Sequence, residues 1–160
     1  MKKILFVTIL SLIFVTKTFA GNDDEFVSLQ AGFLFNNTLN ASFGYEKELR
    51  YDNAYEIFGD MGCSLKRGSH TWGEEHYYWG GSIVYKKSLV RWRNATLRLN
   101  IGPFAGAYRG DFFLAAEGSF EYNYTCYNGW KLMVKQKNNV FFLHGDTFLN
   151  GVQIGLKIPL

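Results

Sequence analysis

The stretch 148–160 alternates between two kinds of residue, and it constrains the fold more than any other part of the chain. From Val152 to Leu160 every second residue is large and apolar, and the residues between are glutamine, glycine, lysine and proline. A period of two places successive side chains on opposite faces of a β-strand. The stretch therefore predicts a strand with one apolar and one polar face. We expect the apolar face to contact lipid, so that this strand closes a small transmembrane barrel.

Seven earlier stretches show the same alternation. The eight expected strands cover residues 26–35, 39–49, 54–65, 77–86, 94–108, 114–124, 130–137 and 148–160. An even number of strands of roughly ten residues each matches the smallest outer-membrane barrels. The pair Asn128-Gly129 is a strong hairpin signal between the sixth and seventh strands. The sequence thus predicts an all-β protein, an eight-stranded antiparallel up-and-down transmembrane β-barrel.

The expected connections differ in length at the two ends of the barrel. Those at one end, 50–53, 87–93 and 127–129, are mostly short, whereas two at the other end, 66–76 and 138–146, are long. Outer-membrane barrels have short periplasmic turns and longer external loops. This pattern predicts that both termini lie in the periplasm.

Residues 1–20 have the features of a signal peptide. Two lysines precede an apolar run, 4–15, and the small residues Thr18 and Ala20 fit a cleavage site. The apolar run is too short for a transmembrane helix, which takes roughly 20 residues. We therefore expect an exported chain with a signal peptide at 1–20 and an outer-membrane barrel at 21–160.

The charge balance argues against nucleic acid as a direct partner. The signal peptide contains three of the 17 Lys and Arg residues, which leaves 14 of them against 14 Asp and Glu residues. Phosphate backbones are bound by clustered Lys and Arg side chains. A balanced chain predicts no direct nucleic-acid binding.

Charged residues fall on the polar face of the expected strands, beside glycine and serine. Six are acidic and six are basic. The interior of an eight-stranded barrel is just wide enough to be filled by side chains, so we expect these charges to pair in the lumen and to leave no pore. The expected lumen charges are Glu46, Glu48, Glu56, Asp60, Lys86, Arg98, Glu117, Glu121, Lys131, Lys135, Lys137 and Lys157.

The two cysteines, Cys63 and Cys126, lie near opposite ends of the expected barrel. Their Cα atoms would be much farther apart than the roughly 7 Å that a disulfide allows. We expect two free thiols.

A soluble barrel of the lipocalin type is an alternative, because it also has eight alternating strands. Its apolar face would point inward and hold a ligand. Aromatic residues near the expected strand ends favour the membrane barrel instead, because such residues form girdles at the membrane interface. These aromatic residues are Tyr45, Tyr55, Tyr77, Trp79, Tyr85, Tyr122, Tyr124 and Trp130.

A catalytic role is a second alternative, in which polar residues of two expected external loops would form the active site. Imidazoles and carboxylates that converge there could bind a metal or activate a nucleophile, as in small lipid-modifying enzymes of the outer membrane. The histidines lack zinc-site spacing and no serine lies in a nucleophile motif, so we expect no catalytic residue and no cofactor. The cluster comprises His70, Glu74, Glu75, His76, His144 and Asp146.

Five segments resemble the conjugal transfer protein TraO family of Bacteroidetes conjugative elements. They are Gly-Tyr-Glu-Lys at 44–47, Asn-Ile-Gly at 100–102, Ala-Gly-Ala-Tyr-Arg-Gly at 105–110, the stretch 132–137, and Gly-Val-Gln-Ile-Gly-Leu-Lys at 151–157. The resemblance implies an outer-membrane component of a type IV secretion-like machine that moves DNA between cells, with other subunits as partners. It carries over no catalytic residue. A small outer-membrane barrel with a role in adhesion or stability remains the alternative.

Overall fold

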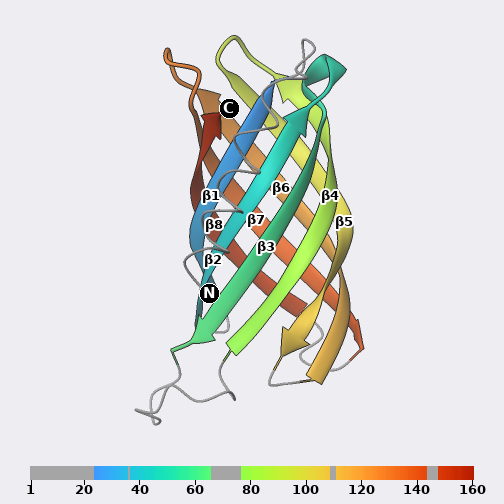
Figure 1. The fold of residues 1–160 in the computed structure, drawn as a ribbon. Coiled ribbons are helices and arrows are strands. Elements are labelled where there is room, and N and C mark those ends of the chain that lie inside the picture. The colour runs from blue at the N-terminus through green and yellow to red at the C-terminus, as the bar shows by residue number, and fades with distance from the viewer. Residues whose placement is uncertain (1–23, 36, 66–76, 109–110, 144–147) are drawn as a thin grey trace, which may run out of the picture.

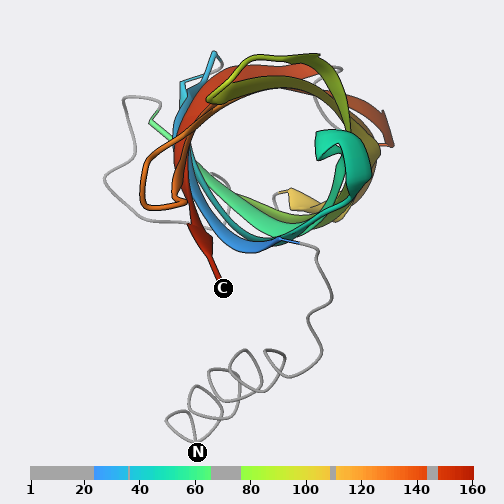
Figure 2. The same cartoon turned by 90° about the horizontal axis from the view of Figure 1, so that it is seen from above.

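In the computed structural model, eight antiparallel strands close into a single barrel (Figures 1 and 2). The structure describes residues 24–35, 37–65, 77–108, 111–143 and 148–160. The strands are β1 (Glu25–Leu34), β2 (Thr38–Glu48), β3 (Ala54–Ser64), β4 (Tyr77–Arg91), β5 (Ala95–Tyr108), β6 (Asp111–Thr125), β7 (Lys131–Leu143) and β8 (Phe148–Pro159). Each strand pairs with the next, and β8 pairs with β1 from Phe26↔Pro159 to Leu34↔Gly151. The predicted all-β, eight-stranded antiparallel barrel is confirmed.

The two ends of the barrel are formed by different connections. The turn end contains 49–53, 92–94 and 126–130, together with the first and last described residues. The loop end is the opposite end, where β1, β3, β5 and β7 end and β2, β4, β6 and β8 begin. A 3-10 turn, η2 (Arg50–Asp52), lies in the first turn of the turn end. No helix in the described ranges is long and apolar enough to cross a membrane.

Strand β4 is longer than the sequence predicts. It continues to Arg91, through most of the stretch 87–93 that the sequence predicts to be a connection. The pairing with β5 shifts register between Ser88 and Val90, which leaves Leu89 and Val90 both exposed. A bulge of this kind breaks the period of two, so the sequence pattern ends before the strand does.

Strand β7 is also longer, and the predicted loop 138–146 is wrong in its first part. The strand continues to Leu143, so that 144–147 alone separate β7 from β8. A register shift between Leu114 and Ala115 of β6 interrupts the alternation opposite this segment. The loop end therefore has one long connection, 65–76, and the two ends differ in loop length less than the sequence predicts.

The inner face of the barrel is mainly polar, and its outer face is mainly apolar. In β3, Glu56 is fully buried, whereas its neighbour Ile57 has 58% of its surface exposed. In β2, Ser42 is buried and Phe43 is 53% exposed. This is the reverse of a water-soluble barrel, in which the apolar face points inward. In the described residues the inner face is thus mainly polar, where a lipocalin-like barrel would have an apolar ligand cavity.

Glycines on the inner face make room for large side chains of neighbouring strands. A Cβ added to Gly62 would lie 2.0 Å from Cε1 of Tyr78, and one added to Gly155 would lie 2.6 Å from Cε of Met133. Proteins pack their interiors as densely as organic crystals. Alternation of glycine with long side chains therefore fills the narrow lumen of an eight-stranded barrel.

The interior has two layers of different chemistry. An apolar cluster fills the loop end, and mainly polar and charged side chains fill the rest as far as the turn end, with Phe26, Phe58, Val84 and Met133 buried among them. The rings of Phe104 and Phe113 lie 5.1 Å apart in this cluster, and Phe113 lies 5.0 Å from Phe141. The buried members of the cluster are Leu34, Tyr78, Phe104, Phe113, Ala115 and Leu149.

Both cysteines are free, as the sequence predicts. Cys63 lies at the loop end of β3, and Cys126 follows β6 at the turn end. Both side chains are half-buried. Neither thiol takes part in a covalent link that would constrain the barrel.

Tight packing on the inner face predicts a large effect of Gly106→Ala. The added Cβ would lie 2.1 Å from the carbonyl oxygen of Trp79 and 2.5 Å from Cα of Gly80, both backbone atoms. We expect this variant to lower the free energy of unfolding by about 1–3 kcal/mol, as overpacking does. The measurement is urea unfolding of the purified protein in detergent.

Gly118→Ala is the matched control, because nothing lies within 4 Å of a Cβ added there. We expect its free energy of unfolding to change by less than about 0.5 kcal/mol. Equal stabilities of the two variants would contradict the packing described for the inner face.

Candidate functional site

Four charged residues from the even-numbered strands form a closed ring inside the barrel. Nζ of Lys86 lies 2.6 Å from Glu46 and 2.7 Å from Glu121, and Nζ of Lys157 lies 2.6 Å from Glu46 and 2.5 Å from Glu121. All four side chains are completely buried. We call Glu46, Lys86, Glu121 and Lys157 the charge ring. It alternates acid and base around the barrel and crosses the whole lumen.

The odd-numbered strands add ion pairs on the turn-end side of this ring. Arg98 donates hydrogen bonds from Nη1 to Glu46, at 2.8 Å, and from Nη2 to Glu48. Lys131 lies 2.6 Å from Glu48. The side chain of Lys131 is 12% exposed, so the network reaches the surface at the turn end.

Glu56 is the third carboxylate that contacts Lys86. Its Oε2 lies 2.8 Å from Nζ of Lys86, so this ammonium contacts three carboxylates. The other oxygen of Glu56 accepts hydrogen bonds from Ser28, at 2.5 Å, and Gln30, at 3.2 Å. Strand β1, which has no charge in the lumen among its described residues, thus contributes polar groups to the network.

A second group of ion pairs lies between the charge ring and the apolar cluster. Lys135 lies 2.5 Å from Glu117, and Lys137 pairs with Asp60. The hydroxyl of Tyr78 donates to Asp60 at 3.0 Å. This contact joins the charged part of the interior to the apolar cluster, to which Tyr78 belongs.

The structure places every predicted lumen charge on the inner face. Eleven of the twelve are buried, and Lys131 is partly exposed. A buried charge is costly unless it is paired and hydrogen-bonded. Each of the six acids lies within ion-pair distance of at least one of the six bases, so the charges balance. The hydrogen bonding is incomplete, because Nζ of Lys135 and Nε of Arg98 have no hydrogen-bond partner.

Three carboxylates of this network are close enough to bind a metal ion. Glu46, Glu56 and Glu121 each have one carboxylate oxygen within 4.8 Å of the other two. In the described part of the chain, this is the one group of three potential metal ligands at such distances. The ammonium of Lys86 contacts all three. The lysine therefore takes the position that a cation would occupy, and the chemistry here is ion pairing.

The predicted external cluster falls in segments that the structure does not describe. His70, Glu74, Glu75 and His76 belong to 66–76, and His144 and Asp146 belong to 144–147. The prediction of a metal or catalytic site there stays a prediction.

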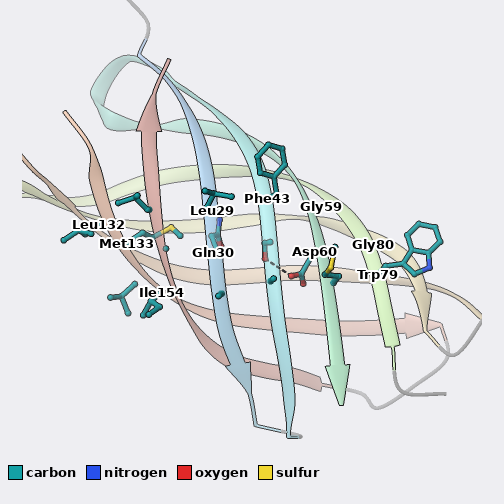
Figure 3. A pocket seen from close by; sticks show the side chains of 17 residues that line it. Leu29, Gln30, Phe43, Gly59, Asp60, Trp79, Gly80, Leu132, Met133 and Ile154 are labelled. Carbon is teal, nitrogen blue, oxygen red and sulfur yellow. Dashed lines mark hydrogen bonds between the residues drawn. The ribbon is translucent and has the colours of Figure 1, made fainter. Parts of the chain in front are cut away.

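An apolar hollow of about 890 Å³ is lined by residues of β1 to β4, β7 and β8 (Figure 3). Its large exposed side chains point outward, whereas Gln30 and Asp60 at its wall are at most 4% exposed. Small residues such as Ala31, Ala41 and Gly59 lie between the large ones. This hollow is not predictable from the sequence, because it depends on the register that aligns the small residues of adjacent strands. Its exposed apolar side chains include Leu29, Phe43, Met61, Trp79, Leu132 and Ile154.

Outward aromatic side chains gather near the turn end. The rings of Tyr55 and Tyr85 lie 5.1 Å apart on β3 and β4, and Trp92 lies 6.4 Å from Tyr122. All four are exposed. Of the other aromatic residues that the sequence analysis singled out, Tyr45, Trp79, Tyr124 and Trp130 are also exposed; Trp79 lies toward the loop end.

Comparisons with known proteins give no relative for this chain. No family model matches the sequence, and no curated protein and no solved structure matches it.

The ring geometry predicts that Lys86→Met is strongly destabilising. The substitution removes the ammonium that contacts three buried carboxylates, so each of these carboxylates loses one ion-pair partner. Breaking a buried pair from one side costs about 3–5 kcal/mol. We expect a loss of that size in the free energy of unfolding, measured with urea in detergent.

Lys87→Met is the matched control, because Lys87 is the exposed neighbour of Lys86. It should change the free energy of unfolding by less than about 0.5 kcal/mol. The double variant Lys86→Met/Glu121→Gln should recover part of the loss, because it removes one of the unpaired carboxylates. If Lys86→Met were as stable as Lys87→Met, the charge ring would not hold the barrel together.

Proposed function

We propose that the protein is an outer-membrane β-barrel with its apolar outer face in lipid and both termini in the periplasm. The observation that carries this proposal is the inverted distribution of side chains. Charges inside the barrel are paired, and described charges outside it lie near the ends of the strands. These outer charges are Asp24, Glu25, Lys47, Arg50, Asp52, Lys87, Arg91, Arg93 and Asp111.

The outer face between the ends is uncharged and rich in large apolar side chains in the described strands. Ile83, Ile101 and Ile154 are each more than half exposed. Soluble monomers rarely expose a continuous apolar surface larger than a few hundred Å². Hydrocarbon is a favourable environment for such a surface, and a closed barrel leaves no unpaired strand edge in it. The aromatic residues near the turn end fit an interfacial girdle.

The filled lumen favours a structural role over conduction. A porin holds a water-filled channel, whereas the charge ring and the apolar cluster occupy the interior here. We propose that the barrel is an anchor whose turns and loops contact other proteins.

The resemblance to the TraO family supports a more specific role. We propose that the barrel is a non-catalytic component of a conjugative DNA-transfer apparatus, a type IV secretion-like machine in the outer membrane. Its partners would be other subunits of that apparatus, and DNA would not be bound directly, in keeping with the balanced charge of residues 21–160.

Deletion of the gene in a donor strain tests this role. We expect the frequency of DNA transfer to fall sharply and to return when the wild-type gene is supplied in trans. Complementation with Gly118→Ala should restore transfer, and complementation with Lys86→Met should restore little, because that barrel is unstable. Normal transfer by the deletion strain would contradict the conjugation proposal and favour a barrel with a role in adhesion or outer-membrane stability.

A further inference from the structure

Each of the three connections at the turn end exposes a large aromatic side chain. Tyr51 is 85% exposed in 49–53, Trp92 is 52% exposed in 92–94, and Tyr127 is fully exposed in 126–130. Turns in water are usually built from small polar residues, glycine and proline. Tyrosine and tryptophan are favoured where one side of the ring meets an apolar phase and the other meets water. The turn end therefore has the chemistry of a membrane interface.

Four cations lie on one side of this end, around the first two turns. Arg50 belongs to η2, Lys87 and Arg91 belong to β4, and Arg93 follows β4; all four are exposed. Nε of Arg91 lies 2.9 Å from Asp52, which fixes the end of β4 against η2. We call Arg50, Lys87, Arg91 and Arg93 the basic rim. With Asp52 among them, four cations face one carboxylate.

The turn that carries Arg50 is held in an unusual conformation. Tyr51 and Asp52 have φ values of 63° and 57°, a region uncommon for residues other than glycine. The side chain of Asn53 donates to the carbonyl of Arg50 at 3.3 Å and accepts from the amide of Ser88 at 3.0 Å. These contacts project Tyr51 and Arg50 from a fixed position beside β4.

The basic rim begins directly beyond the aromatic girdle, which comprises the exposed residues Tyr45, Tyr55, Tyr85, Tyr122 and Tyr124 near the turn end. Lys87 is two residues after Tyr85 on the outward face of β4, and the ring of Tyr85 contacts Tyr55. Toward the turn end, the outer face of β4 is thus apolar at Ile83, aromatic at Tyr85 and basic at Lys87. A bilayer changes in a matching order toward the water, from hydrocarbon through the interface to the headgroups, which contain the phosphate groups.

We infer that the basic rim binds the phosphate groups of anionic glycerophospholipids and holds the three turns level with the headgroups. This inference rests on the proposed membrane location. The exposed aromatic side chains on all three turns favour lipid over an acidic soluble protein, which would need no apolar side chain at each tip. Attraction to an anionic headgroup is worth about fivefold in association for each Lys or Arg near the surface, and salt weakens it.

The test uses the full barrel in vesicles of phosphatidylcholine that contain either spin-labelled phosphatidylglycerol or spin-labelled phosphatidylcholine. The fraction of immobilised label gives the preference of the barrel surface for the anionic lipid. We expect the wild type to prefer phosphatidylglycerol at low salt. The triple variant Arg50→Gln/Lys87→Gln/Arg93→Gln should lose most of that preference.

Lys47→Gln is the matched control. Lys47 is another cation near the turn end, but its ammonium lies 3.9 Å from the carboxylate of Glu25. Its removal should change the preference much less than the triple variant does. Added inorganic phosphate should not compete, because the site requires the headgroup at the depth of the aromatic girdle.

Gel mobility with and without boiling shows whether each preparation contains a closed, inserted barrel. An inserted wild-type barrel without preference for phosphatidylglycerol, or a triple variant with undiminished preference, would overturn the inference and leave the membrane barrel intact. In the first case, an acidic protein partner becomes the better explanation of the basic rim. A wild-type chain that does not insert would overturn both proposals.

Discussion

The fold depends on the pairing of charges inside the barrel. Lys86 and Lys157 bridge Glu46 and Glu121 from both sides, and each of these residues comes from a different even-numbered strand. A barrel whose outer face is apolar must place its polar residues inward, because side chains alternate along each strand. Ionised side chains can remain in that narrow space when each one has a partner. The charge ring supplies these partners and links strands that are not adjacent in the sheet.

The filled interior follows from the same alternation. Glycines such as Gly62 and Gly155 lie opposite large side chains, so there is room for lysines, arginine and aromatic rings inside eight strands. Replacing a buried ion pair by apolar residues is often neutral or stabilising, so the charges are not required for stability alone. An apolar inner face would, however, make the two faces of each strand alike. We infer that the charges specify which face points inward in the seven strands that carry them, β2 to β8.

Much of this architecture is predictable from the sequence, because a period of two holds through most of every strand. The alternation gives the strand count, and the residue types on the polar face give the twelve lumen charges. Strand ends are not predictable where the register shifts, as between Ser88 and Val90 and between Leu114 and Ala115. Nor are the individual ion pairs, since Lys86 meets residues of β2 and β6, two strands away on either side. Acid and base do alternate from Glu46 to Lys157 on the even strands, and that signal could have identified the ring.

The central claim is that the outer face of the barrel contacts lipid, and cysteine labelling in membranes tests it most directly. In a Cys63→Ser/Cys126→Ser background, Ile154→Cys places a thiol at an outward position that is 65% exposed in the middle of β8, and Tyr127→Cys places one at a turn tip. With the barrel in lipid vesicles, we predict that a water-soluble maleimide modifies Tyr127→Cys and spares Ile154→Cys, while a lipid-soluble maleimide modifies Ile154→Cys. Equal modification of both positions by the water-soluble reagent would contradict the account.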